Sequence, residues 1–407
     1  MSGWRVGAII LAMLFGPLRA SAESTEPAML EVFKDGKVGL DFRYRYEFVD
    51  DDAFSKDANA STLRSRLRFA SGTYREVSFF VEVEDVRELK PDDFNSGGGT
   101  SPGRTQYPVV ADPQGTEINQ AYVDYSGIQD TRLRLGRQRI NLDNQRFVGG
   151  VAWRQNEQTF DSISGRYDSE RVTAFYAFVD NVHRIFGESV PAGKHEQDNT
   201  HLLNVQGRFP DIGNLTGYLY HIDDDDDSTF STSTFGIRFT GTREIGEYAL
   251  HHEGEFAYQQ DAGNNPVSYD AIYHHIDVGV KRGSYDVGIG WEVLAGDDSN
   301  PGEAFRTPLA TLHAFNGWAD KFLTTPDAGL SDIYVKFQAN IDKVIIQARY
   351  HHFEQDDGGS TLGDELDIRV GRPFGNHLRA DLFYAAFNGD DGFSDTQKFW
   401  AMMTLKL

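Results

Sequence analysis

The 407-residue sequence predicts an all-β fold. The form expected is a single transmembrane antiparallel β-barrel of about 18 strands, with short turns at one end and long loops at the other. Three observations lead to this prediction. Apolar and polar residues alternate in short segments along nearly the whole chain, short and long connections between the segments alternate, and an export signal precedes them. A barrel wall needs such strands, because one face meets lipid and the other meets water.

The alternation is clearest in residues 38–48, V-G-L-D-F-R-Y-R-Y-E-F. The apolar face is assigned to lipid and comprises Val38, Leu40, Phe42 and Tyr44. The charged face is assigned to the barrel interior and comprises Asp41, Arg43, Arg45 and Glu47. The pattern recurs as far as residues 399–407, in segments close to the length that a tilted membrane strand needs. A half-buried strand of a soluble sandwich would alternate in the same way, so alternation alone does not decide the fold.

The connections favour the membrane barrel. Short turns such as S-G-I-Q-D-T, R-G-S-Y and R-P-F-G-N-H follow the even-numbered segments. Mostly longer, polar loops follow the odd-numbered segments and include residues 50–61, 91–116, 140–159, 181–200 and 297–330. All short turns then lie at one end of the sheet, which is the plan of an outer-membrane barrel with periplasmic turns and extracellular loops. A soluble sandwich has no reason to sort its loops in this way.

The N-terminus is predicted to be a separate unit. Arg5, the apolar run of residues 6–15 and the sequence Ala20-Ser21-Ala22 are typical of a cleaved signal peptide over residues 1–22. The apolar run is shorter than the ~20 residues of a membrane helix. Residues 23–36 are predicted to be a periplasmic N-terminal segment and residues 37–407 the barrel. The expected location is the outer membrane of a Gram-negative bacterium, with outer-membrane lipid and lipopolysaccharide around the barrel.

Composition removes several classes of function. The net charge of −23 argues against nucleic acid as a partner, because a phosphate backbone needs a basic surface. The absence of cysteine excludes a disulfide scaffold and thiol chemistry. The sequence contains no G-x-S-x-G, no H-E-x-x-H and no phosphate-binding loop, which disfavours an enzyme. Two classes of function remain, namely a channel and an adhesin barrel that binds through its long loops.

Arginine is abundant on the face assigned to the interior. The predicted pore-lining residues are Arg43, Arg45, Arg64, Arg66, Arg132, Arg134, Arg137, Arg139, Arg146, Arg154 and Arg369. Rings of guanidinium groups select anions in pores because they replace the hydration shell of a carboxylate or phosphate. The alternative is that these arginines pair with carboxylates of the wall and only maintain its shape.

Two of these arginines are out of phase. Arg137 and Arg139 share the parity of Leu133 and Leu135, which are assigned to lipid, and a bare charge at the midplane would cost about 2–4 kcal/mol. Either Gly136 forms a bulge that changes the register, or the pair lies above the hydrocarbon. With Arg146 and Arg154 in the following loop, they are candidates for an inward basic constriction.

Two segments resemble the alginate-export family of outer-membrane proteins. Residues 135–167, L-G-R-Q-R-I-N-L-D-N-Q-R-F-V-G-G-V-A-W-R-Q-N-E-Q-T-F-D-S-I-S-G-R-Y, are similar to its central signature. Residues 311–322, T-L-H-A-F-N-G-W-A-D-K-F, resemble a loop that folds into or over the pore. The resemblance implies a monomeric 18-stranded channel for an alginate-like or other uronate-type polysaccharide or oligosaccharide, with periplasmic export partners. The alternatives are a general porin and an adhesin.

The sequence predicts no cofactor, although an acidic run could bind a metal ion. Asp223–Asp227 would suit Ca²⁺, but a solvated acidic loop is the favoured interpretation. Adjacent histidines such as His274 and His275 lie on opposite faces of a strand, so neighbouring residues do not form a site together. Glu253 and Glu255 have the spacing of a carboxylate pair on one strand, and wall charge is the simpler interpretation.

Overall fold

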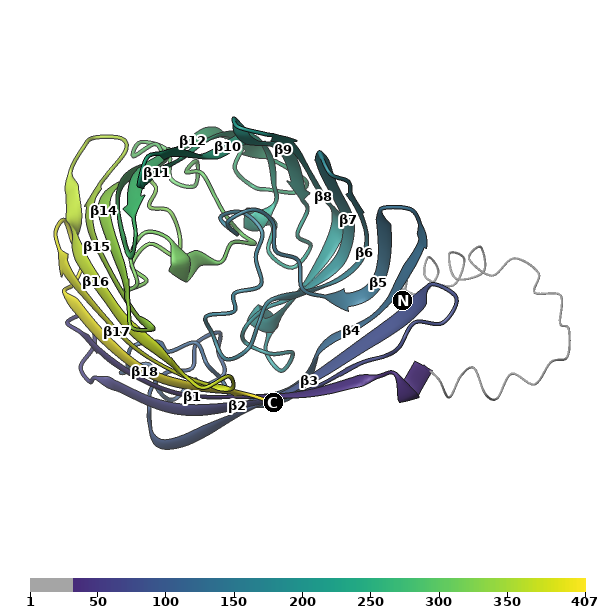
Figure 1. Ribbon diagram of the computed structural model, residues 1–407. Coiled ribbons are helices and arrows are strands. Elements are labelled where there is room, and N and C mark those ends of the chain that lie inside the picture. Colours follow the sequence, from purple (N-terminus) through teal and green to yellow (C-terminus); the bar gives the residue numbers. More distant parts are fainter. Residues whose placement is uncertain (1–31) are drawn as a thin grey trace, which may run out of the picture.

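A computed structural model describes residues 32–407, so the predicted signal peptide and most of residues 23–36 lie outside the described residues. Eighteen antiparallel strands form one sheet, and each strand pairs with its neighbours in the chain. The first strand also pairs with the last, with Asp41 opposite Lys406, so the sheet closes into a barrel (Figure 1). The fold prediction of about 18 strands is confirmed.

The strands are β1 (Lys37–Asp51), β2 (Ala58–Ala70), β3 (Val77–Asp93), β4 (Gly115–Ile128), β5 (Thr131–Gln138), β6 (Thr159–Asp168), β7 (Val172–His183), β8 (Lys194–Phe209), β9 (Gly213–Ile222), β10 (Thr232–Ile245), β11 (Tyr248–Asp261), β12 (Asp270–Arg282), β13 (Tyr285–Leu294), β14 (Leu330–Ile341), β15 (Val344–Glu354), β16 (Thr361–Phe374), β17 (Leu378–Gly389) and β18 (Thr396–Lys406). Three short 3₁₀ turns interrupt the loops, at Pro191–Gly193, Ser228–Phe230 and Leu312–Ala314. In residues 32–407 no helix has the length and apolar character to cross a membrane.

The two faces of the wall are those that the alternation predicts. On β1, Val38 is 68% exposed on the outer face, whereas Glu47 is fully buried on the inner face. The turns that follow even-numbered strands are short, and only two residues separate β4 from β5 and β12 from β13. Most of the loops that follow odd-numbered strands are longer. The sorting of connections by parity is therefore confirmed.

Two of the long loops fold into the barrel instead of remaining outside it (Figure 1). One joins β5 to β6 and is called the 139–158 loop; the other joins β13 to β14 and is called the 295–329 loop. They touch each other at a parallel bridge between Val148 and Leu309. Within residues 311–322, Ala319 and Phe322 are buried, so the prediction of an infolded segment there is confirmed.

The infolded loops bring apolar side chains into the lumen and pack them on aromatic residues of the wall. Trp153 and Trp318 lie against Phe383 of β17, with ring centroids 5.0 and 5.5 Å away. Phe147 contacts Tyr273 of β12 and Phe305 of the other loop. Burial of each such ring contributes about 1.5–3 kcal/mol, so the loops are fixed parts of the fold.

Candidate functional site: the channel interior

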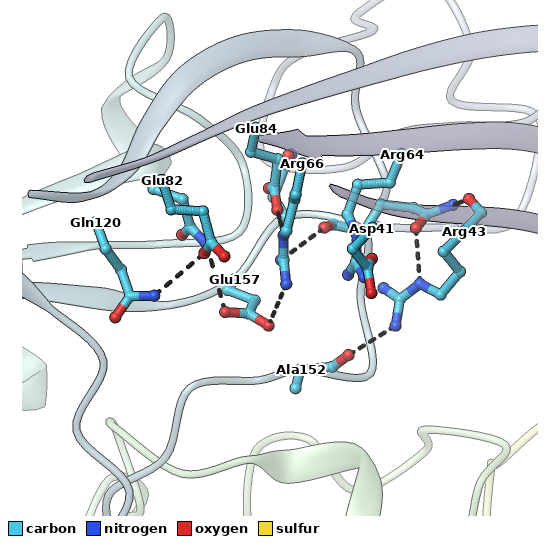
Figure 2. A network of polar contacts seen from close by, with 12 residues as sticks. Asp41, Arg43, Arg64, Arg66, Glu82, Glu84, Gln120, Ala152 and Glu157 are labelled. Atoms are coloured by element: carbon cyan, nitrogen blue, oxygen red, sulfur yellow. Dashed lines mark hydrogen bonds and ion pairs between the residues drawn. The ribbon is translucent and has the colours of Figure 1, made fainter. Parts of the chain in front are cut away.

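The arginines of β1 and β2 are covered by the 139–158 loop. Arg43 donates hydrogen bonds of 2.9 Å to the Ala152 carbonyl and to the Gln155 side chain (Figure 2). Arg64 is held by Asp41 of the neighbouring strand at 2.6 Å. Both arginines are buried. Arg43 supplies a donor to a loop carbonyl oxygen that has left solvent, whereas Arg64 pairs with a carboxylate of the wall.

Arg66 connects the wall to the same loop. Its guanidinium lies between Glu84 of β3 and Glu157 of the loop, with 2.8 Å to Glu157 (Figure 2). Burial alone would raise the pKa of the Glu157 carboxyl, but Arg66 and Arg139 outweigh it and lower the pKa to about 2. Glu157 is therefore charged at every physiological pH, and the ion pair persists.

Arg45 and Arg154 form a second anchor for the loop. Arg45 donates to the Trp153 carbonyl at 2.6 Å and to Glu47 at 2.8 Å. Arg154 donates to Glu47 and, at 2.9 Å, to Asp320 of the 295–329 loop. This pair joins the two loops to each other and to β1.

Asp320 is the acidic centre of that junction. His313 and Lys398 also bind its carboxylate, at 2.7 and 2.9 Å. Burial would raise the pKa of the Asp320 carboxyl, but its basic neighbours outweigh burial and hold the pKa well below the usual range.

Four predicted pore-lining residues of β1 and β2 thus differ from the prediction. All four, Arg43, Arg45, Arg64 and Arg66, are buried. They lie on the inner face, as the parity indicates, but they do not face open lumen. Arg43, Arg45 and Arg66 hold the loop, whereas Arg64 pairs with Asp41 of the wall. The reason is physical: a loop buried in a barrel must have its carbonyl and carboxylate oxygens paired, and guanidinium groups pair them with fixed geometry.

Arg146 of the same loop spans the lumen to the opposite wall. It donates to Glu292 of β13 at 2.8 Å and to Asn316 of the 295–329 loop at 2.9 Å. It is buried, as is Arg154. Neither contributes free positive charge to a constriction, which corrects the expectation for both.

Arg137 and Arg139 lie near the end of β5, and their side chains point in different directions. Arg137 stays on the outer face at the extracellular rim, where it pairs with Asp161 at 2.9 Å and with Glu188 at 3.0 Å. The pairing of β5 with β4 and β6 is continuous through Gly136, so the expected bulge is absent there. Arg139 lies just beyond the strand and turns inward to Glu157 at 2.6 Å. The prediction of an inward pair is wrong for Arg137.

The remaining arginines of β5 line open space. A recess of about 370 Å³ lies along the inner wall at β5 and β6. It is called the basic recess, and its basic residues are Arg132, Arg134, Arg139 and Arg166. No carboxylate lines it. The rest of its wall consists of aromatic, amide, aliphatic and hydroxyl side chains, namely Phe80, Tyr122, Phe175, Gln120, Gln138, Asn141, Ile140, Leu142 and Ser164.

The arginines of the basic recess differ in how they are neutralised. Arg134 is paired with Asp124 at 2.6 Å and stacks on Tyr122, 3.6 Å from the ring centroid. Arg132 has no ion-pair partner in residues 32–407 and stands directly opposite Arg166 across the strand pair. Arg166 has only an exposed partner, Asp168, at 3.4 Å. Like charges opposite each other destabilise a sheet, and a bound anion would offset that cost.

Sequence reasoning missed two parts of this recess. Arg166 lies on the inner face of β6 because Ile163 faces outward, and the same parity applied to S-I-S-G-R-Y would have found it. No sequence pattern indicates that Phe80 and Phe175 line the recess, because an aromatic residue on an inner face is unexpected in a polar lumen.

Arg369 lies apart from this recess, on the inner face of β16. It donates to Asp381 of β17 at 2.8 Å and to Gln347 of β15 at 3.0 Å. It therefore lies in a paired, polar part of the wall.

A second cavity lies on the periplasmic side of the infolded loops. It measures about 680 Å³, and we call it the vestibule. The wall strands β9 to β15 surround it, and Asn144, Phe315 and Asn316 of the two loops cover it. Its charged lining is mixed, with the cations Arg238, Lys336 and Arg349 and the carboxylates Glu253, Asp277, Glu292 and Asp332.

Some carboxylates of the acidic run Asp223–Asp227 accept hydrogen bonds within the protein. Asp224 accepts hydrogen bonds from His195 and Gln197, and Asp227 caps the 3₁₀ turn Ser228–Phe230. Asp226 accepts from the backbone N–H of Glu196 at 2.8 Å, so three of the five carboxylates accept hydrogen bonds within the protein.

Comparison with known families now identifies the relatives of this barrel. The family model described as alginate export matches residues 35–285, which is more than half of the 407-residue chain. The chain belongs to the alginate-export family. No curated protein sequence matches it.

The alginate-export chain also shares its fold with solved outer-membrane porins. OccAB4 of Acinetobacter baumannii has 13% identity and a TM-score of 0.72, over 92% of this chain and 98% of that one. OccK1 (OpdK) of Pseudomonas aeruginosa has 15% identity and a TM-score of 0.71, over 92% and 99%. OpdK has also been solved with vanillate, again at 15% identity and a TM-score of 0.71, over the same shares of the two chains. The protein is therefore an outer-membrane barrel with the fold of porin channels.

Proposed function

We propose that this channel passes anionic solutes, specifically uronate-type oligosaccharides, along the basic recess. The observation that carries the proposal is the opposed pair Arg132 and Arg166 in a recess lined by no carboxylate. Guanidinium groups bind carboxylates through charge-assisted hydrogen bonds, and the amides of the recess suit the hydroxyl groups of a sugar ring.

The size of the open space favours short solutes over a polymer. The recess and the vestibule measure about 370 and 680 Å³, within the range of small-molecule sites. The 139–158 loop borders both spaces, and the 295–329 loop borders the vestibule. An oligomer of a few sugar rings fits such spaces, whereas a long polysaccharide would require both loops to leave.

A second candidate solute is an aromatic carboxylate. Phe80 and Tyr122 stack in the recess with ring centroids 5.2 Å apart, and Phe175 adds a third ring. A benzoate-type ring would pack on them while its carboxylate meets Arg132. The complex of the similar barrel OpdK with vanillate supports testing this class.

The experiment is current block in a planar bilayer. Galacturonate oligomers of two to four rings, neutral oligosaccharides of equal length and benzoate are added to single channels. We expect the uronates to block, and Arg132→Ala to weaken block about tenfold or more, because a charge-assisted hydrogen bond contributes about 1.5–3 kcal/mol.

The control variant is Arg379→Ala, which removes an arginine already paired with Asp381 outside the recess. It should leave block unchanged. Equal block by neutral and acidic sugars would contradict the proposal and leave a general porin. Block by benzoate alone would select the aromatic solute.

A further inference from the structure

A group of potential metal ligands, two of them buried and the third partly exposed, lies on the wall formed by β11 and β12. Glu253 and Glu255 project inward from β11, and His275 projects inward from β12. One ligand atom from each residue lies within 4.8 Å of the other two. The group borders the vestibule, whose lining includes Glu253 and His275, so an ion has a path from the periplasmic side.

Two of the ligand atoms have no hydrogen-bond partner. They are Glu255 Oε2 and His275 Nδ1, and the two side chains are only 1% and 10% exposed. The nearest opposite groups are Arg238 Nε, 3.6 Å from Glu255, and Glu253 Oε1, 3.4 Å from His275. Both distances exceed a normal hydrogen bond. Leaving a buried polar atom unpaired is costly, so a ligand shared by the two atoms is the simplest explanation.

A second set of residues orients the imidazole. His275 Nε2 lies 2.9 Å from the hydroxyl oxygen of Tyr334, and that hydroxyl donates its proton to Asp277 at 2.8 Å. A tyrosine hydroxyl has only one proton, so it accepts from Nε2–H. The lone pair of Nδ1 is then directed at the two glutamates. Metal-binding histidines are held in this way, with the other ring nitrogen donating to a polar chain that ends on a carboxylate.

We propose that Glu253, Glu255 and His275 bind a divalent transition-metal ion, with Zn²⁺ as the best match. Two carboxylates and an imidazole are ligands that zinc accepts, whereas Ca²⁺ and Mg²⁺ prefer oxygen alone. Arg238 neutralises one carboxylate through paired contacts of 2.7 and 3.0 Å with Glu253. One negative charge remains on the group, which favours a divalent cation. Three protein ligands leave a coordination position toward the vestibule.

The site would also act on the infolded loop. Asn144 of the 139–158 loop donates to Glu253 Oε1 at 3.1 Å, so the loop end rests on a metal ligand. Binding of an ion is therefore expected to change the channel current from the periplasmic side. This role is separate from solute passage along the basic recess, which lies on other strands.

The test is calorimetric titration of Zn²⁺ into the EDTA-treated, folded barrel in detergent. Wild type, Glu255→Gln and His275→Gln are compared with the control His251→Gln. His251 lines the same cavity but pairs with Asp286. We expect one Zn²⁺ site whose affinity falls at least tenfold in the first two variants and is unchanged in the control.

Zinc-edge X-ray absorption of the loaded wild type gives a second readout that needs no variant. One imidazole nitrogen and carboxylate oxygens should surround the ion. Absence of the tight site in wild type, its survival in Glu255→Gln and His275→Gln, or a zinc environment without imidazole would each overturn the proposal. His275 would then be an imidazolium between two glutamates.

Discussion

Arg66 and Arg132 both face the barrel interior, yet their surroundings give them different roles. Arg66 lies between Glu84 and Glu157 and is buried. Arg132 is exposed to the basic recess and has no acidic partner within the described residues. Removing a buried partner leaves an uncompensated charge, whereas removing an exposed one alters only the local potential. Arg66 is therefore structural, and Arg132 is available to a solute.

Replacing Arg66 tests the structural role. We expect Arg66→Ala to lower the free energy of unfolding by about 3–5 kcal/mol, because Glu84 is left buried without its cation and Glu157 keeps only Arg139. The measurement is denaturant unfolding of the barrel in detergent. Arg87→Ala is the matched control, since Arg87 pairs with Asp85 on the outer face and is 55% exposed. The control should change stability by less than about 1 kcal/mol, and equal losses in both variants would contradict the role of Arg66.

The pKa of Glu157 gives the pH dependence of the anchor. Its depression from 4.5 to about 2 corresponds to about 3 kcal/mol at most. Because the pKa in the folded barrel is lower than in the unfolded chain, this stability is complete above about pH 5 and is lost as pH falls toward 2. We expect constant channel current from pH 8 to 5 and larger fluctuations below about pH 4. Glu157→Gln should be noisy at pH 7, and a quiet variant would show that the ion pair does not hold the loop.

The sequence predicted whether a wall residue faces inward or outward, but it did not predict which residue its side chain would pair with. Parity placed Arg43 and Arg132 on the same inner face, which is correct. The partners of Arg43 lie more than a hundred residues away, in the 139–158 loop. Strand periodicity is local and contains no information about such contacts.

Among the elements, the 295–329 loop depends on close contact with the wall. The backbone N–H of Ala319 donates to Glu365 of β16 at 2.7 Å, and that of Trp318 donates to Asp367 at 3.3 Å. Gly317 precedes them with φ of +84°, and a Cβ at this position would overlap the Glu365 carboxylate. Glycine is required there for both reasons.

Substitution of this glycine tests the docking of the loop. We expect Gly317→Ala to release the loop end and to raise single-channel conductance and its noise. Gly359→Ala is the control, because Gly359 has a similar φ of +67° but open space around its Cβ position. The control should retain the conductance of wild type. The same increase in both variants would attribute the effect to backbone strain alone.

The element boundaries followed from the sequence more fully than the loop paths. Turns such as S-G-I-Q-D-T and alternating segments such as residues 38–48 are local signals. Infolding of residues 311–322 was predictable from their apolar character and family resemblance. The inward path of residues 139–158 was only suggested by their arginines. The outward position of Arg137 agrees with its strand parity, whereas its partner Glu188 lies in another loop.

For the whole molecule, the acidic net charge and an anion path are compatible. The charge of −23 belongs to the entire chain, and runs such as Asp223–Asp227 lie in loops at the extracellular end. Exposed charges are screened beyond about 10 Å at 0.1 M salt. Ion selectivity is set where a path is narrow and its charges are close, and the proposed path brings the anion to the arginines of the basic recess.

The most direct test of the anion path is the reversal potential under a salt gradient. Single channels of wild type are compared with the double variant Arg132→Ala, Arg166→Ala, with Arg379→Ala as control. We expect anion selectivity in wild type and in the control, and its loss in the double variant. Cation selectivity in wild type, or an unchanged reversal potential in the double variant, would contradict an anion path along the basic recess.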